Sequence, residues 1–527
     1  MHSPNLMPVL LSVLITSAPF SGLLAQAGTL DVTFDGDGRV ITDHMSAYNE
    51  AWDVTVQPDG RIVAVGYVAT TNQGSNFALM RYLPDGTLDS SFSTDGAQDT
   101  DFFGSLDFAT AVALQSDGKI VVAGYTIALA PEIEFAVARY HTDGTLDTTF
   151  GGVGWVTVDI IDGFSNEATA MSVALQPDGK IVVAGSSNDG GITSDIALVR
   201  LHPDGTLDTD LDGDGKLTTA IGTADDVGHS VAVLPNGKIV VAGSTSSGAD
   251  WDIAAVRYNA DGTLDNSFSF DGKVITAIGP GDDLCWSMAL QSQGKIVLAG
   301  YSQDGSNYDF ALVQYNSDGT LDTGFDGDGI VTTDMGNSEF GRAVAIQSDG
   351  KIVAAGSAST ASDEDFAVVR YHANGTLDTD FYGDGTVSTD FGGSEVARAV
   401  ALQPDGKIVL AGTYYAPGVG YDFALARYLS GLNVGVIDLA GPGRSVLVYP
   451  NPIGDEAVLQ YELSKEERIS IRLHDLEGKL LHTFMENRIQ GAGEHHQRIA
   501  LPQALARGAY VLVVSSSAGE VSIRIVR

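Results

Sequence analysis

Residues 178–185 read Asp178-Gly179-Lys180-Ile181-Val182-Val183-Ala184-Gly185, a turn followed by a β-branched run. Phrases of this form recur seven times, with their central glycine at positions 60, 118, 179, 237, 294, 350 and 406. The intervals between these glycines are 58, 61, 58, 57, 56 and 56 residues. A second phrase, Gly-Thr-Leu-Asp, also occurs seven times and begins at Gly28, Gly86, Gly144, Gly205, Gly262, Gly319 and Gly375. Self-similarity at a fixed period indicates a repeat fold.

Each repeat predicts four short strands. In the third repeat we expect them at residues 154–159, 170–176, 180–185 and 195–201. Pro177-Asp178-Gly179 joins the second and third as a hairpin turn, because proline presets φ and glycine accepts a positive φ. A helical period is absent, and four strands in about 57 residues are typical of a propeller blade. The sequence therefore predicts an all-β fold, a seven-bladed β-propeller. An open superhelical array is the alternative, and the pattern does not decide whether the first strand closes the last blade.

These phrases resemble the delta-60 repeat family of bacterial surface and secreted proteins. The resemblance rests on the form D-G-K-I-V-V-A-G, followed by D-F-A-L-A-R-Y and D-G-T-L-D, and it covers residues 28–430. It implies a propeller fold and an external location far more than it implies an activity.

The N-terminus predicts a signal peptide over residues 1–27. Residues 9–15 form an apolar run, and Ala25-Gln26-Ala27 fits a small-residue cleavage site. A buried strand is the alternative. No other stretch has the length of apolar residues that a membrane span needs, so we expect no transmembrane helix in the mature chain.

The repeat pattern ends near Tyr428, and residues 431–444 predict a linker rich in glycine. Strands expected at 446–451, 459–463, 468–474, 479–484 and 510–514 predict a small C-terminal β-sandwich over residues 445–527. This segment resembles the type A sorting domain of the type IX secretion system. The matching residues are Tyr449-Pro450-Asn451-Pro452, residues 473–479, residues 508–514 and a last strand ending at Arg527. The resemblance implies Sec export, contact with the type IX machinery, and an extracellular or outer-membrane-surface location; an ordinary adhesive sandwich is the alternative.

The chain carries a formal net charge of −40, from 28 basic and 68 acidic residues. The segment from Arg444 onward has 10 of each, so 18 basic (28 − 10) and 58 acidic (68 − 10) residues precede it. A surface this acidic argues against binding nucleic acid or anionic lipid. It favours solubility, or the attraction of cations.

Asp210, Asp212 and Asp214, followed by Gly215, form a D-x-D-x-D-G sequence that resembles the start of a calcium loop. Ile221 stands where an EF-hand would place its closing glutamate. We therefore hypothesise calcium at these three aspartates, with a turn that binds nothing as the alternative. No other cofactor is indicated, since H-x-x-H, H-E-x-x-H and C-x-x-C are absent and zinc is disfavoured.

Two further columns of the repeat are informative. Cys285 aligns with small residues in the other six repeats, namely Ala51, Ala109, Ala170, Gly228, Gly341 and Ala397, so we interpret it as a packing residue. An arginine ends the fourth predicted strand of every repeat except the fifth, which has Gln314. The aspartate of Gly-Thr-Leu-Asp follows it, and we expect Arg–Asp pairs that join blades.

The favoured hypothesis is a non-enzymatic, monomeric, secreted or surface propeller that serves binding, adhesion or scaffolding, with a glycan or a surface protein as its ligand. We expect the binding residues in the variable loops 127–134, 186–194 and 414–421. Aromatic candidates for stacking on a glycan are Tyr301, Tyr308, Tyr414, Tyr415, Tyr421 and Trp251, with loop packing as the alternative role. An extracellular enzyme acting on polysaccharide or another polymer is the competing hypothesis. It would require an acidic or histidine-containing cluster unique to one blade near the central axis.

Overall fold

The computed structural model describes most of the repeat region and parts of the C-terminal segment. The described residues are 26–44, 48–69, 74–104, 106–129, 132–161, 167–188, 193–418, 420–431, 446–449, 456–463, 465–474, 479–502, 505, 509–516 and 519–526. Nearly all of the predicted signal peptide and linker lies outside these residues, as do parts of the variable loops and of the sorting motif.

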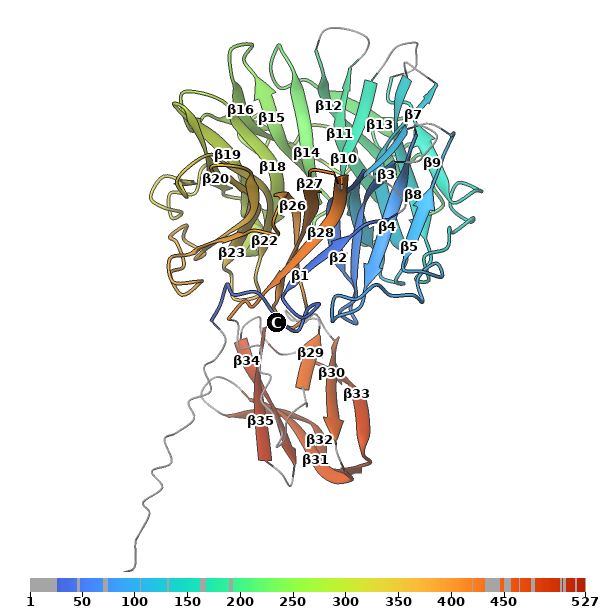
Figure 1. Cartoon of the computed structure of the whole chain (residues 1–527), viewed down its shortest axis with the longest axis vertical. Helices are drawn as coiled ribbons and strands as arrows, with labels where there is room; N and C mark the ends of the chain where they lie inside the picture. Colours follow the sequence, from blue (N-terminus) through green and yellow to red (C-terminus); the bar gives the residue numbers. More distant parts are fainter. Residues whose placement is uncertain are drawn as a thin grey trace, which may run out of the picture.

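The described repeat residues form seven four-stranded antiparallel units, here called blades 1 to 7 (Figure 1). Single parallel pairs, Ser75 with Leu106 and Ile133 with Glu167, connect the first three into one continuous sheet. Blade 1 contains β2 (Asn49–Val56), β3 (Ile62–Ala69), β4 (Ser75–Tyr82) and β5 (Ala97–Thr100). Blade 2 contains β6 (Leu106–Leu114), β7 (Ile120–Leu129), β8 (Glu132–Tyr140) and β9 (Trp155–Val158). Blade 3 contains β10 (Glu167–Leu175), β11 (Ile181–Asn188), β12 (Asp195–Leu201) and β13 (Lys216–Thr219). Blade 4 contains β14 (Asp226–Val233), β15 (Ile239–Ser246), β16 (Trp251–Tyr258) and β17 (Lys273–Thr276).

Blade 5 contains β18 (Asp283–Leu290), β19 (Ile296–Asp304), β20 (Asn307–Tyr315) and β21 (Ile330–Thr333). Blade 6 contains β22 (Glu339–Ile346), β23 (Ile352–Ser359), β24 (Glu364–Tyr371) and β25 (Thr386–Thr389). Blade 7 contains β26 (Ser394–Leu402), β27 (Ile408–Ala416), β28 (Gly420–Tyr428) and β1 (Arg39–Thr42). The first strands of successive blades contact one another around the ring, and β26 contacts β2, so the array is closed.

The N-terminal strand completes the last blade. β1 pairs antiparallel with β28, with Arg39 opposite Ala426 and Thr42 opposite Phe423 (Figure 1). Leu30 of the first Gly-Thr-Leu-Asp phrase also bridges Tyr428. Closure by a strand from the opposite end of the chain answers the question that the repeat pattern leaves open, and it excludes the open superhelix.

One strand belongs to a different blade from the one that the sequence suggests. The run at residues 154–159 was expected to open the third unit, but β9 pairs with β8 and forms the outer edge of blade 2. The physical reason is the Gly144-Thr145-Leu146-Asp147 turn, which reverses the chain after β8. Each sequence repeat is therefore offset by one strand from the blade, and this offset is what requires β1 to complete blade 7.

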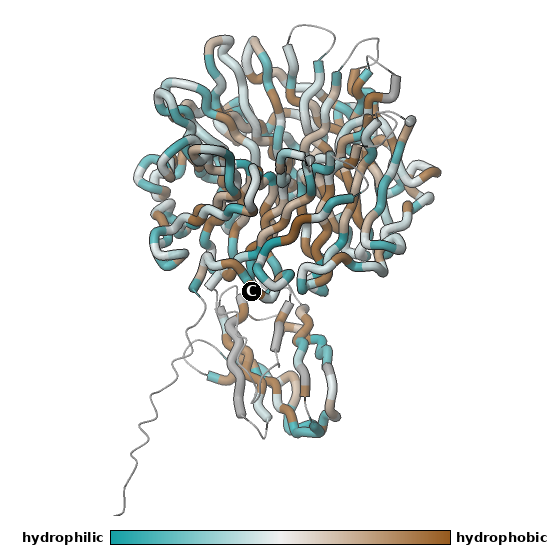
Figure 2. The backbone as a smooth tube through the Cα atoms, in the orientation of Figure 1, coloured by the Kyte–Doolittle hydropathy of each residue, from teal (hydrophilic) through white to brown (hydrophobic). Residues whose placement is uncertain are grey.

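The core lies between adjacent blades, where the β-branched runs of the second strands and the F-A-L-type runs of the third strands are buried. Figure 2 shows brown, apolar backbone along these strands and teal, polar backbone at many of the loops. Gly300 illustrates why the recurring V-A-G phrase ends in glycine. A Cβ at this position would lie 1.7 Å from the carbonyl oxygen of Leu284 on the adjacent strand, so no side chain fits.

The expected Arg–Asp pairs form within single blades, and the arginine joins adjacent blades through a separate hydrogen bond. Arg257 on β16 donates from Nε to Asp265 at 2.6 Å within its own blade. Its Nη1 donates to the carbonyl oxygen of Ser317 in the next blade. The guanidinium also lies 4.6 Å from the ring centroid of Phe268. Gln314, at the corresponding position of blade 5, instead donates to the side chain of Gln291 at 2.9 Å.

The C-terminal segment forms two small sheets with a common core. One sheet has the order β29 (Val446–Tyr449), β30 (Glu456–Leu463) and β33 (Gly493–Ala500). The other has the order β32 (Leu480–Gln490), β31 (Glu467–His474), β34 (Ala509–Ser516) and β35 (Gly519–Val526). Leu459, Ile471 and Leu512 are fully buried between them. Across the described part of the chain, no helix has the length and apolar character that crossing a bilayer requires.

Candidate functional site

The first strand of every blade carries a β-bulge at the same place. In blade 5, Cys285 pairs with Gly300 and Ser287 pairs with Ala299, which leaves Trp286 as the extra residue. A bulge bends its strand and changes the direction of the extra side chain. The seven extra residues are Trp52, Thr110, Met171, His229, Trp286, Arg342 and Arg398.

All seven extra residues line one pocket of about 140 Å³. Because they come from the first strands, which contact one another around the ring, the pocket lies on the axis of the propeller. The residues preceding them are uniformly small, whereas the seven extra residues are nearly all different. The seven repeats thus surround this pocket symmetrically, but the side chains that line it differ from blade to blade. We call it the axial pocket.

One side of the axial pocket is cationic and aromatic. The Arg398 guanidinium lies 4.1 Å from the ring centroid of Trp52, and that of Arg342 lies 5.2 Å from Trp286. Such cation–π contacts hold an arginine over an indole without neutralising its charge. The two arginines come from neighbouring blades 6 and 7, so two positive charges lie side by side in a strongly acidic protein.

The two arginines differ in their partners. Arg398 forms an ion pair with Glu50 at 3.0 Å, and their side chains are 20% and 15% exposed. Arg342 makes no hydrogen bond or ion pair with any described residue; its contacts are the rings of Trp286 and Phe340. Removal from water, together with the charge of Arg398, lowers the pKa of Arg342. Glu364 attracts this charge electrostatically, but no anion is bonded directly to the guanidinium within the described structure.

Asp53 replaces a serine that has a structural role elsewhere in the ring. The hydroxyls of Ser172, Ser230 and Ser287 each accept a hydrogen bond from a backbone N–H of the next blade, at 3.1 to 3.2 Å. Asp53 accepts the equivalent bond from Val112 at 2.8 Å. Burial raises the pKa of Asp53 to about 7, although two backbone N–H groups partly offset the effect.

His229 lies against the aromatic side of the axial pocket. Its ring stacks on Trp286 with centroids 4.4 Å apart. Burial lowers its pKa to about 4, so the imidazole is neutral at physiological pH. Asp53 and His229 both line the axial pocket but make no hydrogen bond with each other in the described structure.

The hypothesised calcium residues lie in the turn between β12 and β13. Asp210, Asp212 and Asp214 are all exposed, and Asp214 accepts a hydrogen bond from the Lys216 backbone at 2.9 Å. Two other acidic groups in the described residues bring three carboxylates within 4.8 Å of one another, and this turn is not one of them. Calcium here stays a hypothesis.

Most of the aromatic candidates form two packed groups. Tyr301 and Tyr308 contact Phe340 with ring centroids 5.2 and 5.3 Å apart. Tyr421 lies between Tyr415 and Tyr48, at 4.6 and 5.5 Å. Tyr48 and Tyr415 keep exposed surface, whereas Trp251 is half-buried at the start of β16. None of these candidates lines the axial pocket.

Sequence reasoning missed the axial residues because it looked for function in the loops. A signal was present in the repeat alignment that classed Cys285 as a packing residue. The next column holds tryptophan, threonine, methionine, histidine, tryptophan, arginine and arginine. The residue type at this position differs between repeats, although the preceding position is always small. Such variation indicates that packing between blades does not determine the residue type at this position.

Comparisons with known proteins match both parts of the chain. Residues 57–92, 115–150, 176–210, 234–268, 291–325, 347–381 and 403–433 match a domain of unknown function, the DUF5122 β-propeller. Residues 447–527 match the secretion system C-terminal sorting domain. No match was found among the curated proteins compared.

Solved structures give more distant likenesses. A protein of unknown function from Dyadobacter fermentans DSM 18053 is 13% identical, with a TM-score of 0.39, covering 74% of this chain and 97% of that one. A PL25 ulvan lyase is 12% identical, with a TM-score of 0.38 and coverages of 77% and 96%. Sqt1 from Chaetomium thermophilum is 11% identical, with a TM-score of 0.37 and coverages of 79% and 94%.

The sorting domain indicates that the protein is secreted to the cell surface or beyond it, and that this segment interacts with the type IX secretion machinery. The seven matched segments each contain the second and third strands of one blade. This chain therefore belongs to the proteins built from DUF5122 β-propeller repeats, and it carries a type IX C-terminal sorting domain.

Proposed function

We propose that the chain is a non-enzymatic, secreted binding propeller that holds an anionic group of a ligand in its axial pocket. Adhesion or scaffolding at the cell surface would follow if that group belongs to a surface or matrix polymer. The observation that carries the proposal is Arg342, whose half-buried guanidinium forms no hydrogen bond or ion pair with an anion among the described residues. A charge held away from water without a partner is costly, so an incoming anion would be favoured.

The composition of the chain makes this arrangement more specific. Acidic residues outnumber basic ones by 40, so a general attraction of anions to the surface is not expected. Discrimination would come from the two guanidinium groups, which offer planar, charge-assisted donors suited to a carboxylate or sulfate. Glu50 already pairs with Arg398, which leaves Arg342 as the main contact for the ligand.

The size of the axial pocket limits what enters it. An apolar cavity of about 150 Å³ accommodates one benzene ring, and the axial pocket measures about 140 Å³. This space suits the carboxylate-bearing end of one acidic sugar, such as a uronic acid residue, and not a long stretch of polymer. We therefore expect the pocket to recognise a terminal or single acidic unit.

Isothermal titration calorimetry of the mature chain with D-glucuronate and D-glucose tests the proposal. We expect binding of glucuronate but not of glucose. Arg342→Gln should weaken binding about tenfold to a hundredfold, because a hydrogen bond to a charged group contributes about 1.5–3 kcal/mol. Met171→Leu, which changes the lining but no charge, should bind as the wild type does. Equal affinity for both sugars, or no effect of Arg342→Gln, would contradict the proposal.

A further inference from the structure

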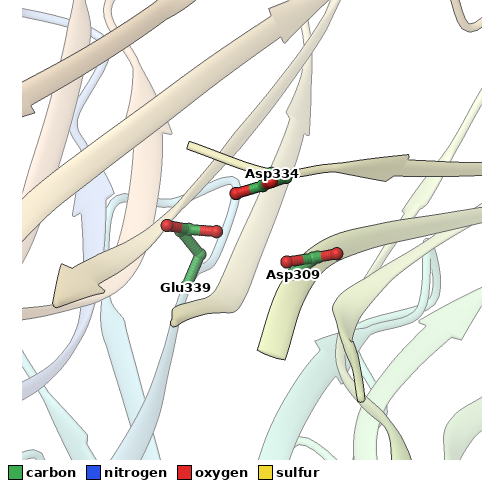
Figure 3. A group of neighbouring side chains, drawn as sticks. All are labelled: Asp309, Asp334 and Glu339. Carbon is green, nitrogen blue, oxygen red and sulfur yellow. The ribbon is translucent and has the colours of Figure 1, made fainter. Parts of the chain in front are cut away.

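Three carboxylates meet where blade 5 joins blade 6. Asp309 lies on β20, Asp334 follows β21, and Glu339 is the first residue of β22. One oxygen from each lies within 4.8 Å of the others. Figure 3 shows the three side chains directed toward one another from three separate segments. Asp334 is exposed, Asp309 is half-buried and Glu339 is buried, so the group extends from the surface inward.

The next junction repeats the arrangement. A second group lies between blades 6 and 7 and consists of Asp365 on β24, Asp390 after β25 and Glu395 on β26. One oxygen from each of these residues again lies within 4.8 Å of the others. The residue types and the order of exposure are the same in both groups. We refer to them as the 5/6 and 6/7 acidic groups.

The buried glutamate of each group has an oxygen without a partner. Glu339 is 1% exposed and Glu395 is fully buried, yet Oε2 of each makes no hydrogen bond in the described structure. The other oxygen is occupied, since Oε1 of Glu339 accepts a bond from the Asn337 backbone at 3.1 Å and Oε1 of Glu395 accepts one from Gly393 at 2.9 Å. A buried carboxylate oxygen that faces two further carboxylates lacks a positive partner.

At two other junctions between blades, the residue that corresponds to the glutamate is hydrogen-bonded within the protein. Between blades 4 and 5 the shorter Asp283 replaces the glutamate, and its Oδ2 accepts bonds from the Ile278 and Gly279 backbones at 2.6 and 3.1 Å. Ala277 occupies the position that corresponds to Asp334. Between blades 7 and 1, Asn49 replaces the glutamate, and its amide donates to Asp43 at 3.5 Å. Among the residues that the structure describes, only the 5/6 and 6/7 groups combine three carboxylates with an unpartnered buried oxygen.

We propose that the 5/6 and 6/7 acidic groups each bind one calcium ion that holds adjacent blades together. Calcium prefers hard oxygen ligands at 2.3–2.6 Å, so two ligand oxygens on opposite sides of the ion lie up to about 5 Å apart. In each group the three oxygens lie within 4.8 Å of one another, which is compatible with this geometry. The exposed aspartate provides an entry path, and water would complete the coordination. The site differs from the Asp210 turn and does not depend on the axial pocket.

Calorimetric titration of the calcium-free mature chain with CaCl₂ tests this proposal through stoichiometry. We expect two ions per wild-type chain, one for Glu339→Gln, one for Glu395→Gln, and none for the double variant. MgCl₂ should bind far more weakly, because magnesium demands a closer octahedral arrangement. The matched control is Asp210→Asn/Asp212→Asn/Asp214→Asn, which should keep both ions.

Thermal unfolding separates loss of binding from loss of folding. The glutamine variants should unfold in EGTA at or above the temperature of the wild type, because they relieve repulsion between the buried glutamate and the two neighbouring aspartates. They should lose the calcium-dependent rise in unfolding temperature that binding to the native state produces. A wild type that binds no calcium, a double variant that still binds two ions, or a loss of both ions in the Asp210 control would overturn the proposal.

Discussion

Arg427 on β28 lies 2.8 Å, from Nη2 to Oδ2, from Asp31, which belongs to the first Gly-Thr-Leu-Asp phrase. The two residues stand at opposite ends of the repeat region, and both side chains are less than 5% exposed. Lys407 approaches the same carboxylate at 3.1 Å. In other blades the corresponding aspartate and arginine come from one continuous segment, as Asp265 and Arg257 do. The pair of Asp31 and Arg427 therefore supports the closure of the ring together with β1.

Asp31→Asn should lower the free energy of unfolding by about 3 kcal/mol, because it leaves a buried arginine without its carboxylate. Urea unfolding followed by circular dichroism measures this change. Asp322→Asn is the matched control, since in blade 5 Gln314 replaces the arginine and Lys295 is the cationic partner. Asp322→Asn should lower the free energy of unfolding by clearly less than Asp31→Asn does. Equal losses would show that Arg427 contributes nothing particular to closure.

Asp208 should make the fold sensitive to acid. Burial acts to raise its pKa, but hydrogen bonds from Lys180 and Arg200 outweigh burial and lower the pKa to about 2. A carboxylate whose pKa is lower in the folded state stabilises the fold above its unfolded pKa, and this contribution is lost as the pH falls through the folded value. The wild type should therefore lose stability between about pH 4 and pH 2.

Asp208→Asn should lower the unfolding temperature at pH 6 and narrow the gap to the wild type as the pH approaches 2. Scanning calorimetry at half-unit pH steps measures both curves. Parallel curves for the two proteins over this range would show that the ion pairs of Asp208 do not contribute to acid stability.

The contribution of Asp53 to stability should depend on pH in the opposite direction from that of Asp208. Its folded pKa of about 7 lies above the unfolded value, so its contribution to stability is greatest below about pH 4 and falls as the pH rises toward 7. Asp53→Ser supplies the hydroxyl that Ser172, Ser230 and Ser287 use in other blades. This variant should be at least as stable as the wild type at pH 8 and less stable relative to it at pH 4. If Asp53→Ser is less stable than the wild type at pH 8, the ionised Asp53 carboxylate does not destabilise the fold, which would contradict this prediction.

The repeats made the fold predictable, and particular residues show why. Runs such as Ile181–Ala184 are apolar and β-branched between turn residues, so their strands follow from local chemistry. Arg257 and Asp265 are eight residues apart in one blade, and their pairing follows from their recurrence. The assignment of β9 to the third blade was wrong, since β9 pairs with β8 in blade 2. The composition of the turn between β8 and β9 does not show whether the strand that follows it ends one blade or begins the next.

The sites were less predictable because they depend on contacts between blades. Arg342 reaches the axis only because a bulge redirects it, and a bulge leaves little trace in the alternation of polar and apolar residues. Asp309 and Glu339 are 30 positions apart (339 − 309) and come from different blades. The Asp210 turn attracted attention because its acids are adjacent in sequence, whereas proximity across a junction is visible only in three dimensions.

Tryptophan fluorescence during titration with D-glucuronate tests the axial pocket most directly. Of the four tryptophans, Trp52 and Trp286 line the pocket, whereas Trp155 packs against Phe102 and Phe103 and Trp251 lies at the start of β16. We predict a saturable change that persists in Trp155→Phe/Trp251→Phe and that needs about tenfold to a hundredfold more glucuronate in Arg342→Gln. An unchanged emission at saturating glucuronate, or a change that is lost with Trp155 and Trp251, would contradict anion binding on the axis.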